Sequence, residues 1–141
     1  MKITDTRNIG VVLALPKQKC NDTKCPFHGK LIVRGRRFVG TVISTKMKKT
    51  AVIEFERLHF LKKYERYEKR RTMLKVHNPE CINAKEGDIV GIMECRPLSK
   101  TKNFVIIQKI GAEKGFKEKM EAREAATIVA KKEEAKAEGE K

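Results

Sequence analysis

The sequence predicts an all-β protein built around a small barrel of five strands, with a looped extension before the barrel and a charged, helical tail after it. Three observations predict this class: five segments rich in Val, Ile, Thr and Phe, short connections between them, and glycines inside the first segment. Strands with these features are typical of small closed barrels, where internal glycines allow bulges and sharp bends. The pattern leaves the order of the strands open.

Residues 1–30 are expected to form the N-terminal extension. They end in CNDTKCPFHGK, which contains the turn formers Asn21, Asp22 and Gly29. Clusters of such residues favour loops over regular structure. We therefore divide the chain into an extension over 1–30, a barrel over 31–111 and a tail over 112–141.

The first two strands are predicted in residues 31–47 and 49–60, and the second of these segments alternates with the period of a half-buried strand. The two segments meet at Met47-Lys48-Lys49, so they are expected to form a hairpin with a basic tip. Gly35 and Gly40 lie inside the first segment, where a glycine allows a bulge.

The next elements are less regular. Residues 61–73 form a basic insertion that reads as helical or irregular, and the pattern does not decide between the two. A short strand is predicted in LKVHNPEC, ending at Asn78-Pro79, and a further strand over Ile89–Cys95, which breaks at Arg96-Pro97. The segment NFVIIQKI supplies the fifth strand.

After Gly111 the composition shifts to Ala, Glu and Lys, with few apolar residues. We favour a helix from about Glu118 to Lys132 that frays beyond that point, and a solvated, mobile tail is the alternative. The elements together fit a small barrel of the oligonucleotide-binding type, although the pattern alone equally allows another five-stranded barrel.

The chain carries a net charge of +15 at pH 7, which points to a polyanionic partner. The excess lies in the first half, because residues 1–75 carry +14, residues 76–110 carry +1 and residues 111–141 carry none. Anionic membranes attract the same charges, but the longest apolar run, 9–15, is too short to span a bilayer. We also expect no signal peptide, and hence a cytoplasmic protein with reduced cysteines.

Cations that bind phosphates release condensed counterions, so clusters of cations indicate a nucleic-acid interface. Two predicted turns are basic: the tip of the first hairpin, and RPLSKTKNF between the last two strands. Guanidinium, ammonium and hydroxyl groups together contact phosphate and ribose oxygens, and a plain soluble turn is the alternative. The predicted RNA-binding residues are Arg34, Arg36, Arg37, Lys46, Lys48, Lys49, Lys62, Lys63, Arg66, Lys69, Arg70, Arg71, Arg96, Ser99, Lys100 and Lys102.

The basic insertion also holds Tyr64 and Tyr67. Aromatic rings can stack on the unpaired bases of a folded RNA. A spacing of three residues is also typical of the packing face of a helix, and we favour packing over stacking for both tyrosines.

The four cysteines raise the question of a metal. Cys20 and Cys25 have a spacing that a structural zinc site allows, and His28 follows them, but Cys81 and Cys95 do not form a second close pair. We therefore predict no cofactor and interpret the cysteines as packing residues, Cys95 among them at the end of a strand. Zinc held by Cys20, Cys25, His28 and Cys81 is the alternative.

No catalytic constellation stands out in the sequence. The acids of residues 54–68 each lie near Lys or Arg, and neither His59 nor His77 has a local partner that indicates a nucleophile or base. We predict that the protein is not an enzyme and has no small-molecule substrate.

The segment GDIVGIMECRPLSKTKNF, residues 87–104, resembles the ribosomal small-subunit protein seventeen (uS17) family, whose hallmark is Gly-Asp, an alternating strand, and then basic-Pro-aliphatic-Ser with further lysines. GTVISTKMKKTAVIEFER, residues 40–57, resembles the first hairpin of that family. CPFHGKLIVRGRRFVG, KYERYEKRRT and HNPEC are similar to its archaeal branch. The resemblance covers about residues 9–110 and leaves the tail unexplained.

The resemblance implies a five-stranded oligonucleotide-binding (OB-fold) barrel without enzymatic activity. It also implies direct binding to small-subunit ribosomal RNA near its five-prime region, early in assembly, beside other small-subunit ribosomal proteins and without a membrane partner. We therefore expect a structural constituent of the small ribosomal subunit in the cytoplasm. The alternative is a free OB-fold module for single-stranded nucleic acid or transfer RNA, which needs an exposed aromatic platform on the barrel.

Overall fold

The computed structural model describes residues 6–13, 15–16 and 18–139. Within these residues lie five strands, one turn of 3-10 helix and one α-helix, which confirms the predicted all-β class with a helical tail. The elements are β1 (Val33–Ser44), β2 (Thr50–Leu61), η1 (Lys62–Tyr64), β3 (Arg66–His77), β4 (Asp88–Ser99), β5 (Lys102–Ala112) and α1 (Phe116–Gly139). The helices in this part of the chain are too short or too polar to cross a membrane.

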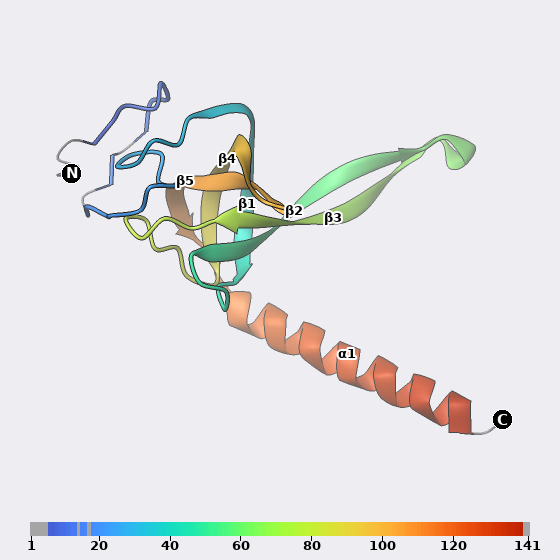
Figure 1. The fold of residues 1–141 in the computed structure, drawn as a ribbon. Coiled ribbons are helices and arrows are strands. Elements are labelled where there is room, and N and C mark those ends of the chain that lie inside the picture. Colours follow the sequence, from blue (N-terminus) through green and yellow to red (C-terminus); the bar gives the residue numbers. More distant parts are fainter. Residues whose placement is uncertain (1–5, 14, 17, 140–141) are drawn as a thin grey trace.

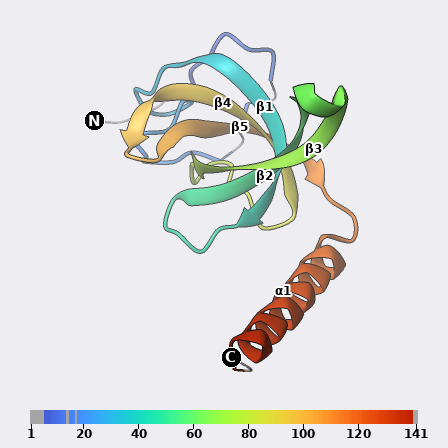
Figure 2. The same ribbon diagram turned by 90° about the vertical axis from the view of Figure 1, so that its right-hand side faces the viewer.

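The five strands close into a barrel in the order β1-β2-β3-β5-β4, and Figure 2 shows this ring with α1 leaving below it. Neighbouring strands are antiparallel except for β3 and β5, which run parallel and pair through Val76↔Phe104 and His77↔Val105. This short parallel contact closes the ring. A small five-stranded barrel of this kind is an OB-fold, so the predicted fold is confirmed.

The first strand bulges outward at Gly35. Against β4, the register passes from Val33↔Cys95 to Arg37↔Met93, so β1 advances four residues where β4 advances two. Gly35 has a φ of +100°, which glycine adopts more readily than other residues. The predicted bulge is therefore confirmed, and the two extra residues of β1 place its arginines on the outside of the barrel.

Buried apolar residues form three clusters. The largest fills the barrel, the second lies between the extension and the outer face of β4 and β5, and the third lies within the extension and the β3–β4 connection. The barrel cluster is Val42, Ala51, Ile53, Val76, Ala84, Val90, Ile92 and Ile106. The second is Leu31, Val33, Met93, Cys95, Val105 and Ile107, with Ile9, Val11 and Leu13 packed against it, and the third is Cys20, Cys25, Phe27 and Cys81.

The N-terminal extension packs on the barrel without helix or strand among its described residues, as predicted for a looped segment. Figure 1 shows it beside β5 and β4, on the side of the barrel opposite to the tip of β2 and β3. Arg7 joins the two ends of the extension, because its guanidinium donates to the carbonyls of Pro26 and Leu31. Ile9, Val11 and Leu13 pack against the second cluster, whereas Val12 between them is exposed.

The prediction of helical or irregular structure for residues 61–73 was wrong except at 62–65, which form η1 and a turn. The other residues form strand, and β3 pairs with β2 in one uninterrupted register from Thr50↔His77 to Leu61↔Arg66. The outer half of this hairpin projects beyond the barrel as a two-stranded ribbon (Figure 1). Both faces of the ribbon are largely exposed, so polar residues occur on both faces. The sequence therefore lacks the alternation of apolar and polar residues that indicates a strand.

The predicted end of the fourth strand was also wrong. β4 does not stop at Cys95 but continues through Arg96-Pro97 to Ser99, which pairs with Lys102. The register shifts between Glu94 and Ser99, where the strand accommodates a proline that has no N–H to donate. The connection between β4 and β5 is therefore only Lys100-Thr101.

The tail helix is longer than expected. α1 begins at Phe116 rather than Glu118, and it continues to Gly139 instead of fraying after Lys132. Phe116 is half-buried beside Gly87, where an added Cβ would lie 3.0 Å from the Phe116 ring. Residues 121–129 are exposed, so within residues 116–129 it is the first turns of α1 that contact the barrel.

Candidate nucleic-acid interface

The connection between β1 and β2, residues 45–49, is the first basic turn, which we call turn 1. The N–H of Thr50 donates to the carbonyl of Met47 at 3.1 Å, and Lys49 has a φ of +52°. Lys46 and Lys48 are exposed, whereas the Nζ of Lys49 lies 2.9 Å from Glu80 Oε1. The hydrogen bond to Glu80 raises the pKa of Lys49. Turn 1 thus offers two lysines to a partner and anchors the third.

The second basic turn, which we call turn 2, is the Lys100-Thr101 connection together with the strand ends that flank it, residues 96–102. Arg96, Ser99 and Lys100 are exposed. Lys102 is half-buried, and its Nζ donates to Thr50 Oγ1 at 2.8 Å. Burial lowers the pKa of Lys102. This contact joins turn 2 to the first residue of β2, directly after turn 1, so the fold brings the two predicted turns to neighbouring places on the barrel.

The bulge of β1 presents Arg34, Arg36 and Arg37 to solvent. The Glu94 carboxylate lies over the bulge and accepts the backbone N–H of Arg36 at 3.2 Å, and the Arg36 Nε lies 3.8 Å from it. Among the side chains that the structure describes, Arg34 and Arg37 have no acidic partner within 4 Å. All three arginines are therefore accessible to a partner, and their contact with RNA stays a prediction.

The basic residues of the β2–β3 ribbon divide between its two faces. Residues opposite each other in an antiparallel pair share a face, and the pairs Arg57↔Arg70 and Leu58↔Lys69 are adjacent, so they lie on opposite faces. One face therefore carries Arg57, Arg66 and Arg70, and the other carries Lys69 and Arg71, while Lys62 and Lys63 lie at the tip in η1. A ribbon with cations on both faces can contact two phosphate backbones at once.

The favoured reading of the two tyrosines was wrong. Tyr64 and Tyr67 do not pack in the protein interior, because they are 62% and 69% exposed. Tyr67 instead contacts Phe60 across the ribbon, with ring centroids 5.1 Å apart, and the Lys63 ammonium lies over the Tyr64 ring. The ribbon tip is thus an aromatic surface with cations around it, as base stacking requires.

Internal ion pairs separate the predicted cations into two groups. Four of them have a carboxylate within 4 Å among the described side chains: Arg36, Lys49, Arg70 and Arg71. Lys102 is held by Thr50. The exposed cations that remain without a described acidic partner are Arg34, Arg37, Lys46, Lys48, Lys62, Lys63, Arg66, Lys69, Arg96 and Lys100.

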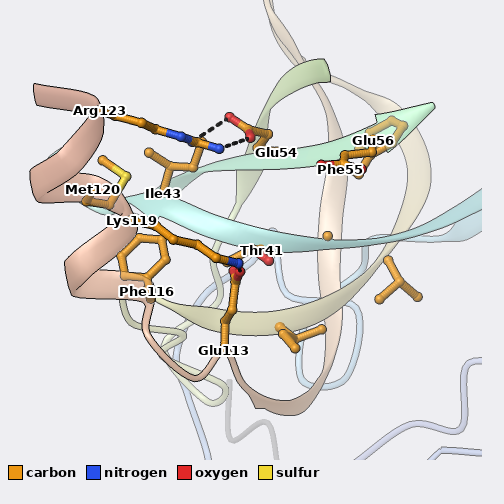
Figure 3. Close-up of a pocket in the computed structure, with 13 residues that line it drawn as sticks. Thr41, Ile43, Glu54, Phe55, Glu56, Glu113, Phe116, Lys119, Met120 and Arg123 are labelled. Carbon is orange, nitrogen blue, oxygen red and sulfur yellow. Dashed lines mark hydrogen bonds and ion pairs between the residues drawn. The ribbon is translucent and has the colours of Figure 1, made fainter. Parts of the chain in front are cut away.

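A groove separates α1 from the barrel, and Figure 3 shows the side chains that line it. Arg123 reaches from the helix to β2, where its guanidinium donates to both oxygens of Glu54 at 2.9 and 3.3 Å. Lys119 pairs with Glu113 at the other end of the groove. Because its polar groups bind each other, the groove serves to attach the tail.

The four residues that the sequence analysis named as an alternative zinc site lie close together in the structure. Cys20, Cys25, His28 and Cys81 are all buried, and their ligand atoms lie within 4.8 Å of one another. The hydrogen bond with Cys81 lowers the pKa of Cys25 to about 5, and backbone N–H groups of His28 and Phe27 contribute. Cys95 lies elsewhere, in the cluster beneath the extension, which confirms its predicted role in packing.

One buried polar pair was missed by sequence reasoning. His77 Nε2 lies 2.8 Å from Asp22 Oδ2, and both residues are buried. Burial lowers the pKa of His77, so its neutral ring donates the Nε2 proton to the carboxylate. No local signal in the sequence could reveal this pair, because 55 positions separate its members. It fastens the extension to the end of β3.

Residues 40–108 match the family model described as Ribosomal protein S17. The chain is 56% identical over 105 residues to the small ribosomal subunit protein uS17 of Methanocaldococcus jannaschii, which covers 74% of this chain and 90% of that protein. It is 54% identical over 102 residues to uS17 of Methanoculleus marisnigri and 56% identical over 102 residues to uS17 of Methanococcus vannielii, each covering 72% of this chain and 94% of the relative. The chain therefore belongs to the ribosomal protein S17 family, with archaeal members among its relatives.

Proposed function

We propose that the protein is a structural constituent of the small ribosomal subunit, located in the ribosome in the cytoplasm, and that it binds small-subunit ribosomal RNA directly, near the five-prime region. Membership of the S17 family supports the ribosomal role. The single observation that supports direct RNA binding is the set of ten exposed cations without a described acidic partner, distributed over turn 1, turn 2, the bulge and the ribbon. In this role the protein performs no catalysis.

The barrel acts as a rigid frame in this proposal. Lys46 and Lys48 in turn 1 and Arg96 and Lys100 in turn 2 bind the sugar-phosphate backbone at neighbouring places, while the ribbon contacts RNA farther away. Contacts at separate places on one stiff body fix the relative positions of RNA helices. Phosphate contacts position a protein without reading sequence, and the folded shape of the RNA supplies the specificity.

The free nucleic-acid-binding module is disfavoured by the aromatic residues of the barrel. Phe38 stacks on Phe55 with ring centroids 5.0 Å apart and contacts Phe104 in a tilted arrangement with centroids 5.8 Å apart, and all three rings are half-buried. Rings that stack on one another are not free to stack on successive bases. Among the described residues, the exposed aromatic side chains lie on the ribbon tip instead.

Binding to folded and unstructured RNA distinguishes the two functions. We expect the full chain to bind a transcript of the five-prime domain of an archaeal small-subunit RNA more tightly than an unstructured oligonucleotide of equal length, as measured by filter binding over a salt series. Replacing Lys48 and Lys100 by Ala should weaken binding and reduce the salt slope by about 1 for each lost phosphate contact. Lys114→Ala and Lys117→Ala, in the electrically neutral tail, are the matched controls. Equal affinity for both RNAs would contradict the proposal.

A further inference from the structure

The third buried cluster brings together four side chains whose chemistry suits a metal ion. Cys20, Cys25 and His28 come from one loop of the extension, and Cys81 comes from the connection between β3 and β4. All four are buried, with exposed fractions of 7% or less. Three sulfur atoms and one imidazole nitrogen form a donor set that zinc favours.

Three of the six distances between the donor atoms are close to those of a tetrahedral zinc site. With zinc–sulfur bonds of about 2.3 Å and zinc–nitrogen bonds of about 2.0–2.1 Å, tetrahedral ligands lie about 3.8 Å apart for two sulfurs and about 3.6 Å apart for sulfur and nitrogen. The Cys25 and Cys81 Sγ atoms are 3.6 Å apart, and the His28 Nδ1 lies 3.3 Å from Cys20 Sγ and 3.7 Å from Cys25 Sγ. All four donor atoms lie within 4.8 Å of one another, so one small cation can contact them together.

The loop is folded tightly to bring its ligands together. The Gly29 N–H donates to the Cys25 carbonyl at 3.0 Å, and the Cys25 N–H donates to the Asp22 carbonyl at 3.0 Å. A Cβ at Gly29 would approach the carbonyl oxygens of Thr23, Asp22 and Cys25 to 2.5–2.7 Å, so a larger residue does not fit there. This compact turn fixes the side chains of Cys20, Cys25 and His28 on one side of the loop.

Thiolate is the form of cysteine that binds metal, and neutral imidazole is the form of histidine that does. The His28 Nδ1 faces the sulfurs, so the Nε2 atom carries the ring proton when Nδ1 binds the ion.

We propose that these residues bind a structural Zn²⁺ ion, with the Sγ atoms of Cys20, Cys25 and Cys81 and the Nδ1 atom of His28 as a closed tetrahedral set. The set leaves no open position for water or substrate, which is the mark of a structural site. Binding of zinc releases the protons of the cysteine thiols to solvent. It also joins the extension to the connection between β3 and β4. It acts beside the Asp22–His77 pair, which attaches the same loop to β3.

Elemental analysis of the purified full chain tests the proposal. The protein is prepared in the presence of a thiol reductant and without added metal, and zinc is measured by inductively coupled plasma mass spectrometry. We expect close to one equivalent of zinc per chain, as a closed four-ligand site requires. Replacement of zinc by Co²⁺ should give the thiolate charge-transfer and ligand-field absorption of tetrahedral cobalt. A chain that is folded and fully reduced but contains no zinc overturns the proposal.

Two cysteine variants provide a matched comparison. Cys81→Ser removes a proposed ligand and should lose at least nine-tenths of the zinc, whereas Cys95→Ser changes an equally buried cysteine outside the cluster and should retain it. Equal zinc in the two variants overturns the proposal. If Cys81→Ser does not fold, the thiols of the wild-type chain are titrated with a mercurial while the released zinc is measured. Zinc release should accompany modification of the cluster thiols, and thiol modification without zinc release would overturn the proposal. A disulfide between Cys25 and Cys81 in the chain as isolated also overturns it. These measurements involve no RNA, so they are independent of the proposed function.

Discussion

Lys100 and Lys102 have the same charge and lie in the same turn, but the structure gives them different roles. Lys100 is exposed, whereas Lys102 donates to Thr50 Oγ1 and is half-buried. Lys100→Ala should therefore reduce the salt slope of RNA binding by about 1 and leave the free energy of unfolding unchanged. Lys102→Ala should lower the free energy of unfolding by about 0.5–1.5 kcal/mol, since it removes an internal hydrogen bond.

Filter binding and urea denaturation of both variants separate these effects. Identical behaviour of the two lysines in both measurements would show that the contact with Thr50 does not distinguish them. The sequence could identify both residues as cations near a turn. It could not predict that one of them bridges to another strand, because that contact depends on barrel closure.

Gly35 is the residue on which the bulge of β1 depends. Its φ of +100° is strained for any residue with a Cβ, and an added Cβ would lie 2.8 Å from Glu94 Oε2. The carboxylate is the end of a flexible side chain and can move, so the backbone conformation determines the result. Gly35→Ala should lower the free energy of unfolding by about 1–3 kcal/mol.

Gly111→Ala is the control for this substitution, because nothing lies within 4 Å of a Cβ at that position. Its effect on the free energy of unfolding should stay within about 0.5 kcal/mol. Chemical denaturation of both variants checks the prediction. A Gly35→Ala variant as stable as the wild type would mean that the bulge relaxes without strain.

At the scale of elements, the β2–β3 ribbon carries a separable part of the predicted interface. Its outer half contributes little to the barrel core, because the buried residues of the hairpin are confined to the inner half. Replacing residues 60–67 by Asn-Gly would leave His59 and Glu68, which already pair, beside a two-residue turn. We expect the shortened chain to keep its stability within about 1 kcal/mol, since surface changes away from the core have small effects.

RNA affinity of the shortened chain should fall, because the deletion removes Tyr64, Tyr67 and the cations of the tip. Stacking on an aromatic residue contributes about 1–3 kcal/mol per base. A shortened ribbon with Tyr and Lys restored at its new tip is the matched control. Unchanged affinity for the folded RNA would show that the ribbon lies outside the interface.

A strand could be predicted from the sequence where one of its faces is buried and the other faces solvent, because apolar and polar residues then alternate. Ala51 and Ile53 are buried with half-buried Val52 between them, because β2 borders the barrel interior there, and the strand was predicted from alternation in this segment. The same strand pair was misread farther out, where solvent contacts both faces and no period remains. Pro97 gave a false end to β4, because a bulge accommodates it within the strand.

The cysteine–histidine cluster of the extension shows why sites are harder to predict than strands. Cys20, Cys25 and His28 are close in the sequence, and they were identified as candidate ligands. The fourth residue, Cys81, is 56 positions from Cys25 and reaches the cluster only because the extension folds over the end of β3. Spacing alone therefore favoured the packing interpretation, and the three-dimensional fold was needed to bring the four donor atoms together.

At the scale of the whole molecule, the positive charge is concentrated in residues 1–75, whereas the tail carries no net charge and contacts the barrel through α1. Residues 1–75 carry nearly all of the net charge, and residues 111–141 carry none. The tail is nevertheless attached, because Arg123 forms two hydrogen bonds to the carboxylate of Glu54, whose side chain is only 10% exposed. The tail should therefore affect stability more than RNA affinity.

Removal of α1 tests this division of roles. A chain that ends at Lys114 loses Arg123 and the contacts of Phe116 and Met120, and it leaves Glu54 with only the more distant guanidinium of Arg71, at 3.9 Å, among the described partners. We expect the free energy of unfolding to fall by about 1–3 kcal/mol, because a largely buried carboxylate loses its closest partner and an aromatic ring its packing. The salt slope of RNA binding should not change. Arg123→Ala should reproduce part of the loss, and Lys117→Ala, on the exposed side, should not. Urea denaturation and filter binding measure both quantities, and a truncated chain with full stability but weaker RNA binding would reverse the assignment of roles to tail and barrel.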